Sequence, residues 1–202
     1  MRHHTSHAAA LALLSAAALG CRHGDRVRAD SATGASSARP GSTTAPSPTQ
    51  PASPWTVTDS GAGVLRIGMT RDGLARELHS MPAGGASAGS DCSYLDIDGM
   101  PAGMRTMWVT GTLARIEITA PGVRTDRGAG VGDDRMRIDS LYGGRTTTMP
   151  AKYDPHGSYI VVRPASATDS SRRIVFETDS THRVTRYRAG REPEVEWVEG
   201  CG

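Results

Sequence analysis

The stretch IGMTRDGL, at residues 67–74, and the stretch VGDDRMRI, at residues 131–138, decide the fold that the sequence predicts. Each stretch places a capping residue before apolar residues at helical spacing. Thr70 in the first, and Asp133 or Asp134 in the second, can accept a hydrogen bond from the N–H groups of the first helical turn. The sequence therefore predicts two short helices that begin in the same way.

Each predicted helix is followed by segments in which apolar and polar residues alternate with a period of two. Such segments, rich in β-branched and aromatic residues, are typical of half-buried β-strands. The expected strands are residues 93–98, 104–110 and 113–119 after the first helix, residues 158–163, 172–178 and 182–188 after the second, and a last strand at 194–198. We therefore expect an α+β fold: two tandem units, about residues 55–120 and 121–202, each a helix plus an antiparallel meander, that form one domain.

The chain before this domain has a different composition. Arg2 precedes an apolar run at residues 8–19, which suits a secretory signal and is too short to span a bilayer. Residues 21–54 are rich in Ser, Thr, Ala, Pro and Gly and contain no aromatic residue, so they cannot bury enough apolar surface to offset the entropy of ordering. We expect a signal peptide at 1–20, a flexible linker at 21–54 and the folded domain at 55–202.

The end of the signal segment, Ala18-Leu19-Gly20-Cys21, resembles the lipobox of bacterial lipoproteins. This resemblance implies that the Cys21 thiol carries a lipid and that cleavage follows Gly20. The residue after the cysteine is Arg22 rather than aspartate, which in the sorting rules of such lipoproteins favours the outer membrane, with the protein facing the periplasm. Ala18 also suits an ordinary signal peptidase, so secretion without a lipid remains an alternative.

Two cysteines remain besides Cys21, and an oxidising compartment favours their pairing. A bridge between Cys92 and Cys201 would close a loop of about a hundred residues and contribute roughly 4 to 5 kcal/mol in the loop-entropy treatment. Neither cysteine lies in a CxxC motif or beside a histidine, so a metal site or catalytic thiol is the weaker interpretation. We expect a structural disulfide.

Two family resemblances bear on function. The opening Ile67-Gly68-Met69-Thr70 before a helix and strands resembles the small outer-membrane lipoproteins of the SmpA/OmlA type, and its tandem use is similar to β-lactamase inhibitory protein. Residues 121–201, with Leu141-Tyr142-Gly143 and the tail from Glu196 to Cys201, are similar to a family of uncharacterised proteobacterial lipoproteins. These resemblances imply a non-enzymatic, protein-binding role in the cell envelope.

Several motifs have chemical potential but lack the context that their chemistry needs. Ser87 lies in a G-x-S-x-G pattern without the flanking strand and helix of a nucleophile elbow. The glycines before the second helix lack the spacing and the lysine of a phosphate-binding loop. The remaining candidates are three scattered histidines and two same-face carboxylate pairs: His79, His156 and His182, Asp96 with Asp98, and Glu177 with Asp179. We expect no catalysis, no metal and no cofactor.

A binding surface is the remaining expectation. The net charge of +2 and the pI of about 8.6 fall short of a nucleic-acid-binding domain, so no nucleic acid is expected. If each helix covers one sheet face, arginines and large side chains on the other face suit protein contacts. The candidate surface is Trp108, Arg115, Arg186, Tyr187 and Trp197. We expect an envelope protein as the partner, bound by a scaffold or inhibitor; a lectin-like module for glycan or peptidoglycan, and aromatics that simply fill the core, remain alternatives.

Overall fold

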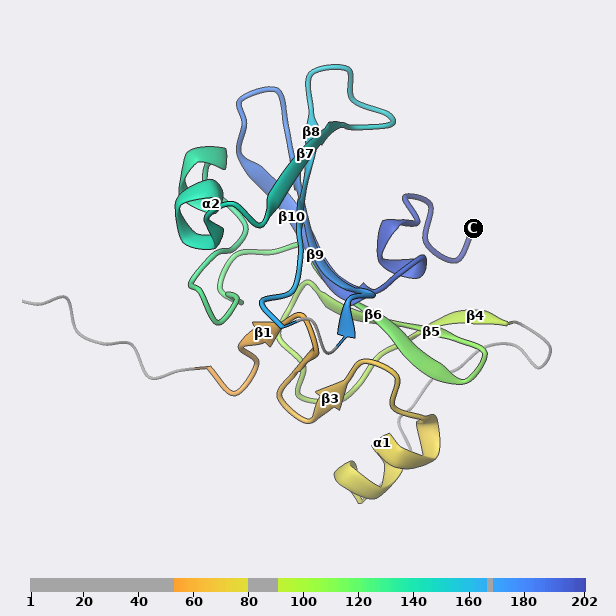
Figure 1. Cartoon of the computed structure of the whole chain (residues 1–202). Helices are drawn as coiled ribbons and strands as arrows, with labels where there is room; N and C mark the ends of the chain where they lie inside the picture. Colours follow the sequence, from red (N-terminus) through yellow and green to blue (C-terminus); the bar gives the residue numbers. More distant parts are fainter. Residues whose placement is uncertain (1–52, 80–90, 167–168) are drawn as a thin grey trace, which may run out of the picture. The chain divides into compact units, whose positions relative to one another are not determined.

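The computed structural model describes residues 53–79, 91–166 and 169–202 (Figure 1). The predicted signal peptide, Cys21, nearly all of the linker and Ser87 lie outside the described residues. Within the described ranges, the helices are too short and too polar to cross a membrane.

Two α-helices form where the capping residues predict them. Helix α1 spans Arg71–Leu78, and the Thr70 hydroxyl accepts a hydrogen bond from the Gly73 N–H at 3.1 Å. Helix α2 spans Arg135–Tyr142, and the Asp134 carboxylate accepts one from the Arg137 N–H at 2.8 Å. Of the two candidate caps, Asp134 is therefore the one that the helix uses, because its side chain satisfies an N–H group that has no partner within the helix.

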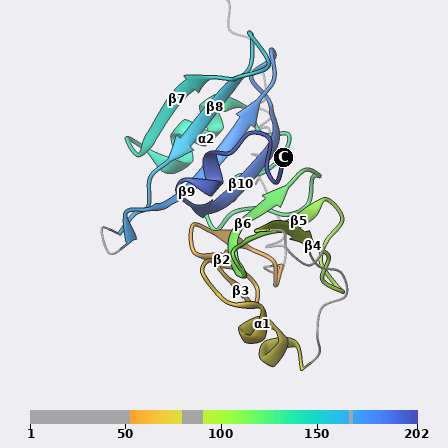
Figure 2. The ribbon, with the colours of Figure 1, turned by 90° about the vertical axis from the view of Figure 1, so that its right-hand side faces the viewer.

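Most of the described chain forms antiparallel strands. One sheet contains seven strands in the order β4-β5-β6-β10-β9-β8-β7 (Figure 2). These strands are β4 (Cys92–Leu95), β5 (Met104–Val109), β6 (Thr112–Ile118), β7 (Thr146–Pro150), β8 (Ser158–Val162), β9 (Arg172–Thr178) and β10 (Val184–Arg191). A small sheet precedes α1 and contains β1 (Val57–Thr58), β2 (Gly61–Ala62) and β3 (Leu65–Arg66).

The predicted α+β arrangement of two tandem helix-meander units is wrong. The described residues are mostly β: they contain two eight-residue α-helices and ten strands. Strand β6 pairs with β10, so that Ile118 lies opposite Tyr187 and Ile116 opposite Ala189, and the strands of both halves make one continuous sheet. A strand with an unpaired edge exposes N–H and C=O groups, and pairing β6 with β10 removes two such edges at once.

Local details also differ from the expected strands. The predicted strand at 194–198 is instead a 3₁₀-helix, η2 (Glu194–Glu196), that begins after Pro193. A proline lacks the N–H group that a sheet ladder needs, which explains why pairing does not continue through this segment. Strand β7 was not predicted, since its sequence TTTMP alternates weakly and ends in proline.

The two faces of the seven-stranded sheet have different surroundings. One face packs against α1, α2 and the small sheet and forms the main core, in which Leu65, Leu74 and Ile138 are fully buried. The rings of Tyr142 in α2 and Phe176 in β9 lie 5.8 Å apart, which places α2 over this face. Each large apolar side chain buried in this way contributes roughly 1.5 to 3 kcal/mol. On the other side lies η2 with the C-terminal segment (Figure 1).

The predicted disulfide is confirmed. Cys92 in β4 and Cys201 near the C-terminus are bonded, with their Cα atoms 5.4 Å apart and 109 positions apart in the sequence. The bond fastens the end of the chain to an edge strand of the large sheet.

Candidate functional site

The sheet face opposite the main core is the candidate functional site, and we call it the open face. Side chains that lie directly across from one another on paired strands point to the same side of a sheet. The register therefore assigns two rows to this face. They are Arg105, Glu117, Arg188, Val175 and Val161 in the first row, and Arg186, Glu177, Tyr159 and Met149 in the second.

Four arginines and two glutamates form a network across β5, β6, β10 and β9. Glu117 accepts hydrogen bonds from Arg105, at 2.7 Å, and from Arg115. Glu177 accepts one from Arg186 at 2.9 Å and a longer contact of 3.5 Å from Arg188. Each carboxylate thus contacts two guanidinium groups. With four arginines and two glutamates, the network has two more positive than negative charges.

Two of these arginines are buried. The side chains of Arg115 and Arg188 are only 1% and 5% exposed. Burial, and then the nearby Arg115, lower the pKa of Arg188, whereas the hydrogen bond to Glu177 raises the pKa of Arg186. A buried charge is costly unless polar groups surround it. The hydrogen-bond partners of Arg115 and Arg188 are therefore needed to offset the cost of burying these two charges.

Part of their role is to hold the C-terminal segment. Arg115 Nη1 donates to the carbonyl oxygens of Glu194 and Trp197, at 3.0 and 2.6 Å, and Arg188 Nε donates to the carbonyl of Val195. The two guanidinium groups thus add donors to the carbonyl oxygens of this turn, of which the Glu194 carbonyl also accepts from the Trp197 N–H. The segment is therefore fixed beside the open face rather than free to move over it.

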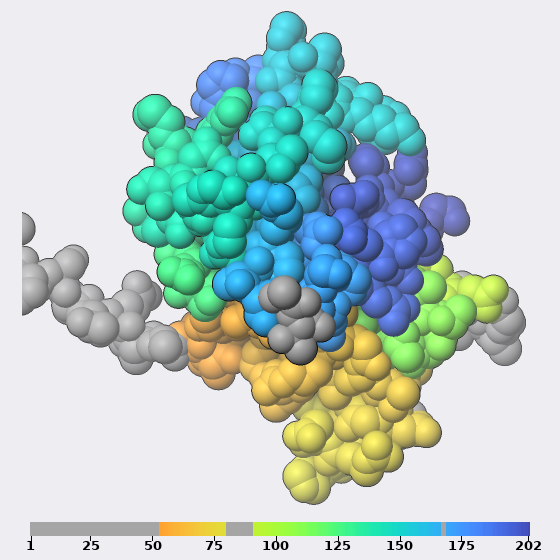
Figure 3. Space-filling view, viewed as in Figure 1, coloured from red at the N-terminus to blue at the C-terminus, as the bar shows by residue number. Residues whose placement is uncertain are grey.

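A groove of about 250 Å³ lies between the β7–β8 hairpin and η2. Figure 3 shows a hollow between the loop after β7 and the C-terminal segment. Apolar side chains dominate the lining, with one cation and one carboxylate: Met149, Pro150, Tyr159, Val161, Val175, Arg188 and Glu196. Met149, Tyr153 and Trp197, from the groove and the segments beside it, are among the exposed large apolar residues of the described chain. Scattered single apolar side chains are ordinary, but a grouping next to a groove is typical of a binding surface.

The candidate surface from the sequence is partly wrong. Trp108, Arg115 and Tyr187 are each 1% exposed and cannot touch a partner. Trp108 and Tyr187 belong to the main core, as the alternative interpretation held, and the Tyr187 hydroxyl donates to the Val123 carbonyl. Arg186 and Trp197 are accessible.

Sequence reasoning missed the groove. Met149 and Tyr153 belong to a hairpin of which only the second strand, Ser158–Val162, coincides with a predicted strand. The aromatic and apolar residues on both sides of Pro150 were the available signal. The pairing of β7 with β8 sets Met149 opposite Tyr159. Only this pairing shows that Met149 and Tyr159 line one surface.

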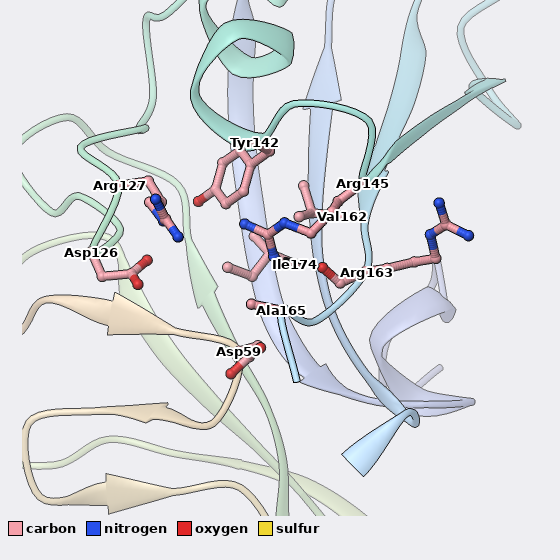
Figure 4. Close-up of a pocket in the computed structure, with 9 residues that line it drawn as sticks. All are labelled: Asp59, Asp126, Arg127, Tyr142, Arg145, Val162, Arg163, Ala165 and Ile174. Carbon is pink, nitrogen blue, oxygen red and sulfur yellow. Dashed lines mark hydrogen bonds between the residues drawn. The ribbon is translucent and has the colours of Figure 1, made fainter. Parts of the chain in front are cut away.

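A second cavity lies on the core side of the sheet and holds about 60 Å³ (Figure 4). The guanidinium groups of Arg127 and Arg145 extend toward it, whereas that of Arg163 points away (Figure 4). Tyr142 also lines this cavity. Burial raises the pKa of Tyr142 to about 12, and its hydrogen bond to Thr125 opposes part of this increase. The space is enough for water or a small ion.

The other chemical candidates act in turns and caps. The Asp179 carboxylate accepts hydrogen bonds from the N–H groups of Thr181 and Arg183, and His79 and His182 occupy turn positions with positive φ. Asp133 accepts one from the Gly130 N–H in the glycine-rich loop before α2. In the described ranges, His, Cys, Asp and Glu side chains do not gather in threes as a metal site requires.

Comparisons with known proteins add little. No family model matches this sequence, and no curated protein gives a significant match. Among solved structures, an extracellular protein containing an SCP domain from Bacillus anthracis is similar over 62% of this chain, with 10% identity and a TM-score of 0.39; this chain covers only 44% of that protein. The uncharacterised protein yfeY from Escherichia coli is similar over 67% of this chain and 99% of its own, with 17% identity and a TM-score of 0.35. The resemblances to lipoprotein families stay predictions.

Proposed function

We propose that this protein is a non-enzymatic binding module that docks another protein on its open face. The observation that carries the proposal is the apolar groove beside η2, which is lined by exposed Met149 and by Arg188 of a network with surplus positive charge. Large apolar side chains with arginine are enriched at protein interfaces. As a scaffold or as an inhibitor, the module would act by occupying a surface of its partner.

The proposed location is the periplasmic side of the bacterial outer membrane. The lipobox-like Ala18-Leu19-Gly20-Cys21 and the linker after it support a lipid anchor with a tether, although both lie outside the described residues. The disulfide between Cys92 and Cys201 supports an oxidising compartment. A tether of about 33 residues lets the domain reach partners several nanometres from the membrane surface.

A site-specific photocrosslinking experiment tests this function. The full-length protein, produced in bacterial cells, carries a photoreactive residue at Met149 on the open face or at Met136 on α2. Met136 is the matched control because it is an even more exposed methionine, 79% against 41%, away from the groove. We expect a defined protein adduct from position 149 alone. No adduct from position 149, or the same adducts from both positions, would contradict the proposal.

A glycan-binding module is the second candidate, because one observation favours it. The hydroxyl of exposed Tyr153 donates to the Glu199 carboxylate, which also pairs with Lys152, and exposed Trp197 lies two residues before Glu199 in the chain. Aromatic rings that stack on sugars beside carboxylates that accept from hydroxyl groups would suit a glycan. Cosedimentation with purified peptidoglycan sacculi tests it: binding that Trp197→Ala abolishes and Met136→Ser retains would replace the protein-binding function with this one.

A further inference from the structure

We infer that the partner segment bound by the open face is acidic, with a carboxylate that binds Arg188 and Arg186 while an apolar neighbour fills the groove. This inference rests on the proposed protein-binding function and names the chemistry of the partner. It differs from a general apolar contact because it requires a negative charge at one defined end of the groove.

The first argument is the charge balance of the network. Glu177 is shared unequally, at 2.9 Å to Arg186 and 3.5 Å to Arg188. Glu117 lies across from Arg188 in the sheet register, but it bonds to Arg105 and Arg115 instead. Arg188 therefore has the longest carboxylate contact of the four guanidinium groups. A partner carboxylate would supply the negative charge that the network lacks.

The second argument is the position of Arg188. Its side chain is 5% exposed, yet it lines the groove, so its remaining access is toward whatever the groove holds. Nε is bonded to the Val195 carbonyl, Nη1 contacts Glu177 and the guanidinium carbon lies 5.5 Å from the centre of the Tyr159 ring, whereas Nη2 forms no hydrogen bond with the described residues. Charge-assisted hydrogen bonds from arginine to carboxylate are among the strongest available, and a poorly solvated site strengthens them further.

Arg186 extends this site to the rim. It lies two residues before Arg188 on β10, on the same side of the sheet, and its side chain is half-exposed. A carboxylate that reaches Arg188 would approach past Arg186, which attracts it from solvent. An exposed cation at an interface rim mainly raises the association rate, whereas a buried one mainly slows dissociation.

The other lining residues of the groove determine which type of residue fits next to the partner's carboxylate. Tyr159, Val161 and Val175 form an apolar floor, and Met149 stands at the edge strand. Glu196 also lines the groove and would repel a second negative charge. The fitting segment therefore has an Asp or Glu directed to Arg188 and an aliphatic or aromatic residue next to it, rather than a run of acids.

Selection from a random peptide library tests the inference. Full-length protein is immobilised, and bound peptides are sequenced after selection against the unchanged chain. We expect enrichment of Asp or Glu next to a large apolar residue. Binding of the selected peptides should weaken about tenfold or more in Arg188→Gln and about threefold in Arg186→Gln. Arg76→Gln, an exposed arginine on α1, removes the same charge elsewhere and should bind as the unchanged protein does.

Arg188→Gln loses a bond to the C-terminal segment and needs a folding check by circular dichroism, so Arg186→Gln is the decisive variant if Arg188→Gln unfolds. Enrichment of neutral or basic peptides, no enrichment at all, or equal weakening by Arg76→Gln would overturn the inference. A protein adduct at position 149 together with any of these results would overturn the acidic chemistry alone. No adduct would remove the proposed function as well.

Discussion

Arg188 and Glu117 lie directly opposite each other on β10 and β6, but the guanidinium of Arg188 contacts Glu177 and the Val195 carbonyl instead. The carboxylate of Glu117 pairs instead with Arg105 on the neighbouring strand β5 and with Arg115 on its own strand. The ion pairs of Glu117 and the ion pair of Arg188 with Glu177 thus meet at the β6–β10 pairing, but the two sets share no bond. This pairing also joins the strands of the two halves, so the open face spans both.

Removal of the Arg115 guanidinium should strongly destabilise the fold. Arg115→Met removes a donor from the carbonyl oxygens of Glu194 and Trp197 and from the Glu117 carboxylate, which keeps its pair with Arg105. Breaking a buried ion pair costs about 3 to 5 kcal/mol when the remaining charge has no other partner, so with Arg105 still on Glu117 we expect a loss near the lower end, about 3 kcal/mol, in urea unfolding. The control is Arg135→Met, which removes an exposed pair with Asp139 and should cost less than about 0.5 kcal/mol. Similar losses for both variants would show that the network does not stabilise the fold.

Loss of the disulfide should lower stability without changing the strand order. The double variant Cys92→Ser, Cys201→Ser should unfold about 2 to 5 kcal/mol more easily, because the unfolded chain gains the freedom of a 109-residue loop. Denaturant unfolding of the unchanged protein, with and without reductant, gives an independent measure. A reduced protein as stable as the oxidised one would contradict the expectation.

The two N-caps should contribute comparable stabilisation. Thr70→Ala and Asp134→Ala each remove an acceptor from the first turn of a helix, and each should cost about 0.5 to 2 kcal/mol. Thermal unfolding measures both. Asp72→Ala, in the first turn of α1 but not at its cap, should cost less than Thr70→Ala. The reverse order would mean that charge near the helix end, rather than the cap bond, determines stability.

Alkaline pH should unfold the protein through its buried tyrosines. Burial raises the pKa of Tyr142 to about 12, from an ordinary value near 10, and burial also raises the pKa of Tyr187. A raised pKa stabilises the fold below pH 10, and this contribution is lost as the pH rises toward 12. Absorbance of tyrosinate should follow unfolding in that range. Tyr142→Phe should lose less stability between pH 10 and 12 than the unchanged protein; an identical pH dependence would contradict the assignment.

Much of the local structure follows from short-range features. Thr70 and Asp134 mark helix starts because a cap acts on N–H groups within one turn of it. Alternation, together with β-branched and aromatic residues, located β5, β6, β8, β9 and β10 for the same reason, since both signals lie in neighbouring residues. The strands of the small sheet are two residues long and carry no such signal.

The sequence by itself determined the helix starts, most of the strands and the cysteine pair. The tertiary structure alone decided that β6 pairs with β10, that Trp108 and Tyr187 face the core, and that Met149 and Tyr159 line a groove. Alternation shows that neighbouring side chains point to opposite faces, but it does not show which face other elements will cover. That choice depends on contacts between segments far apart in the chain, such as α2 with β9 and η2 with β6.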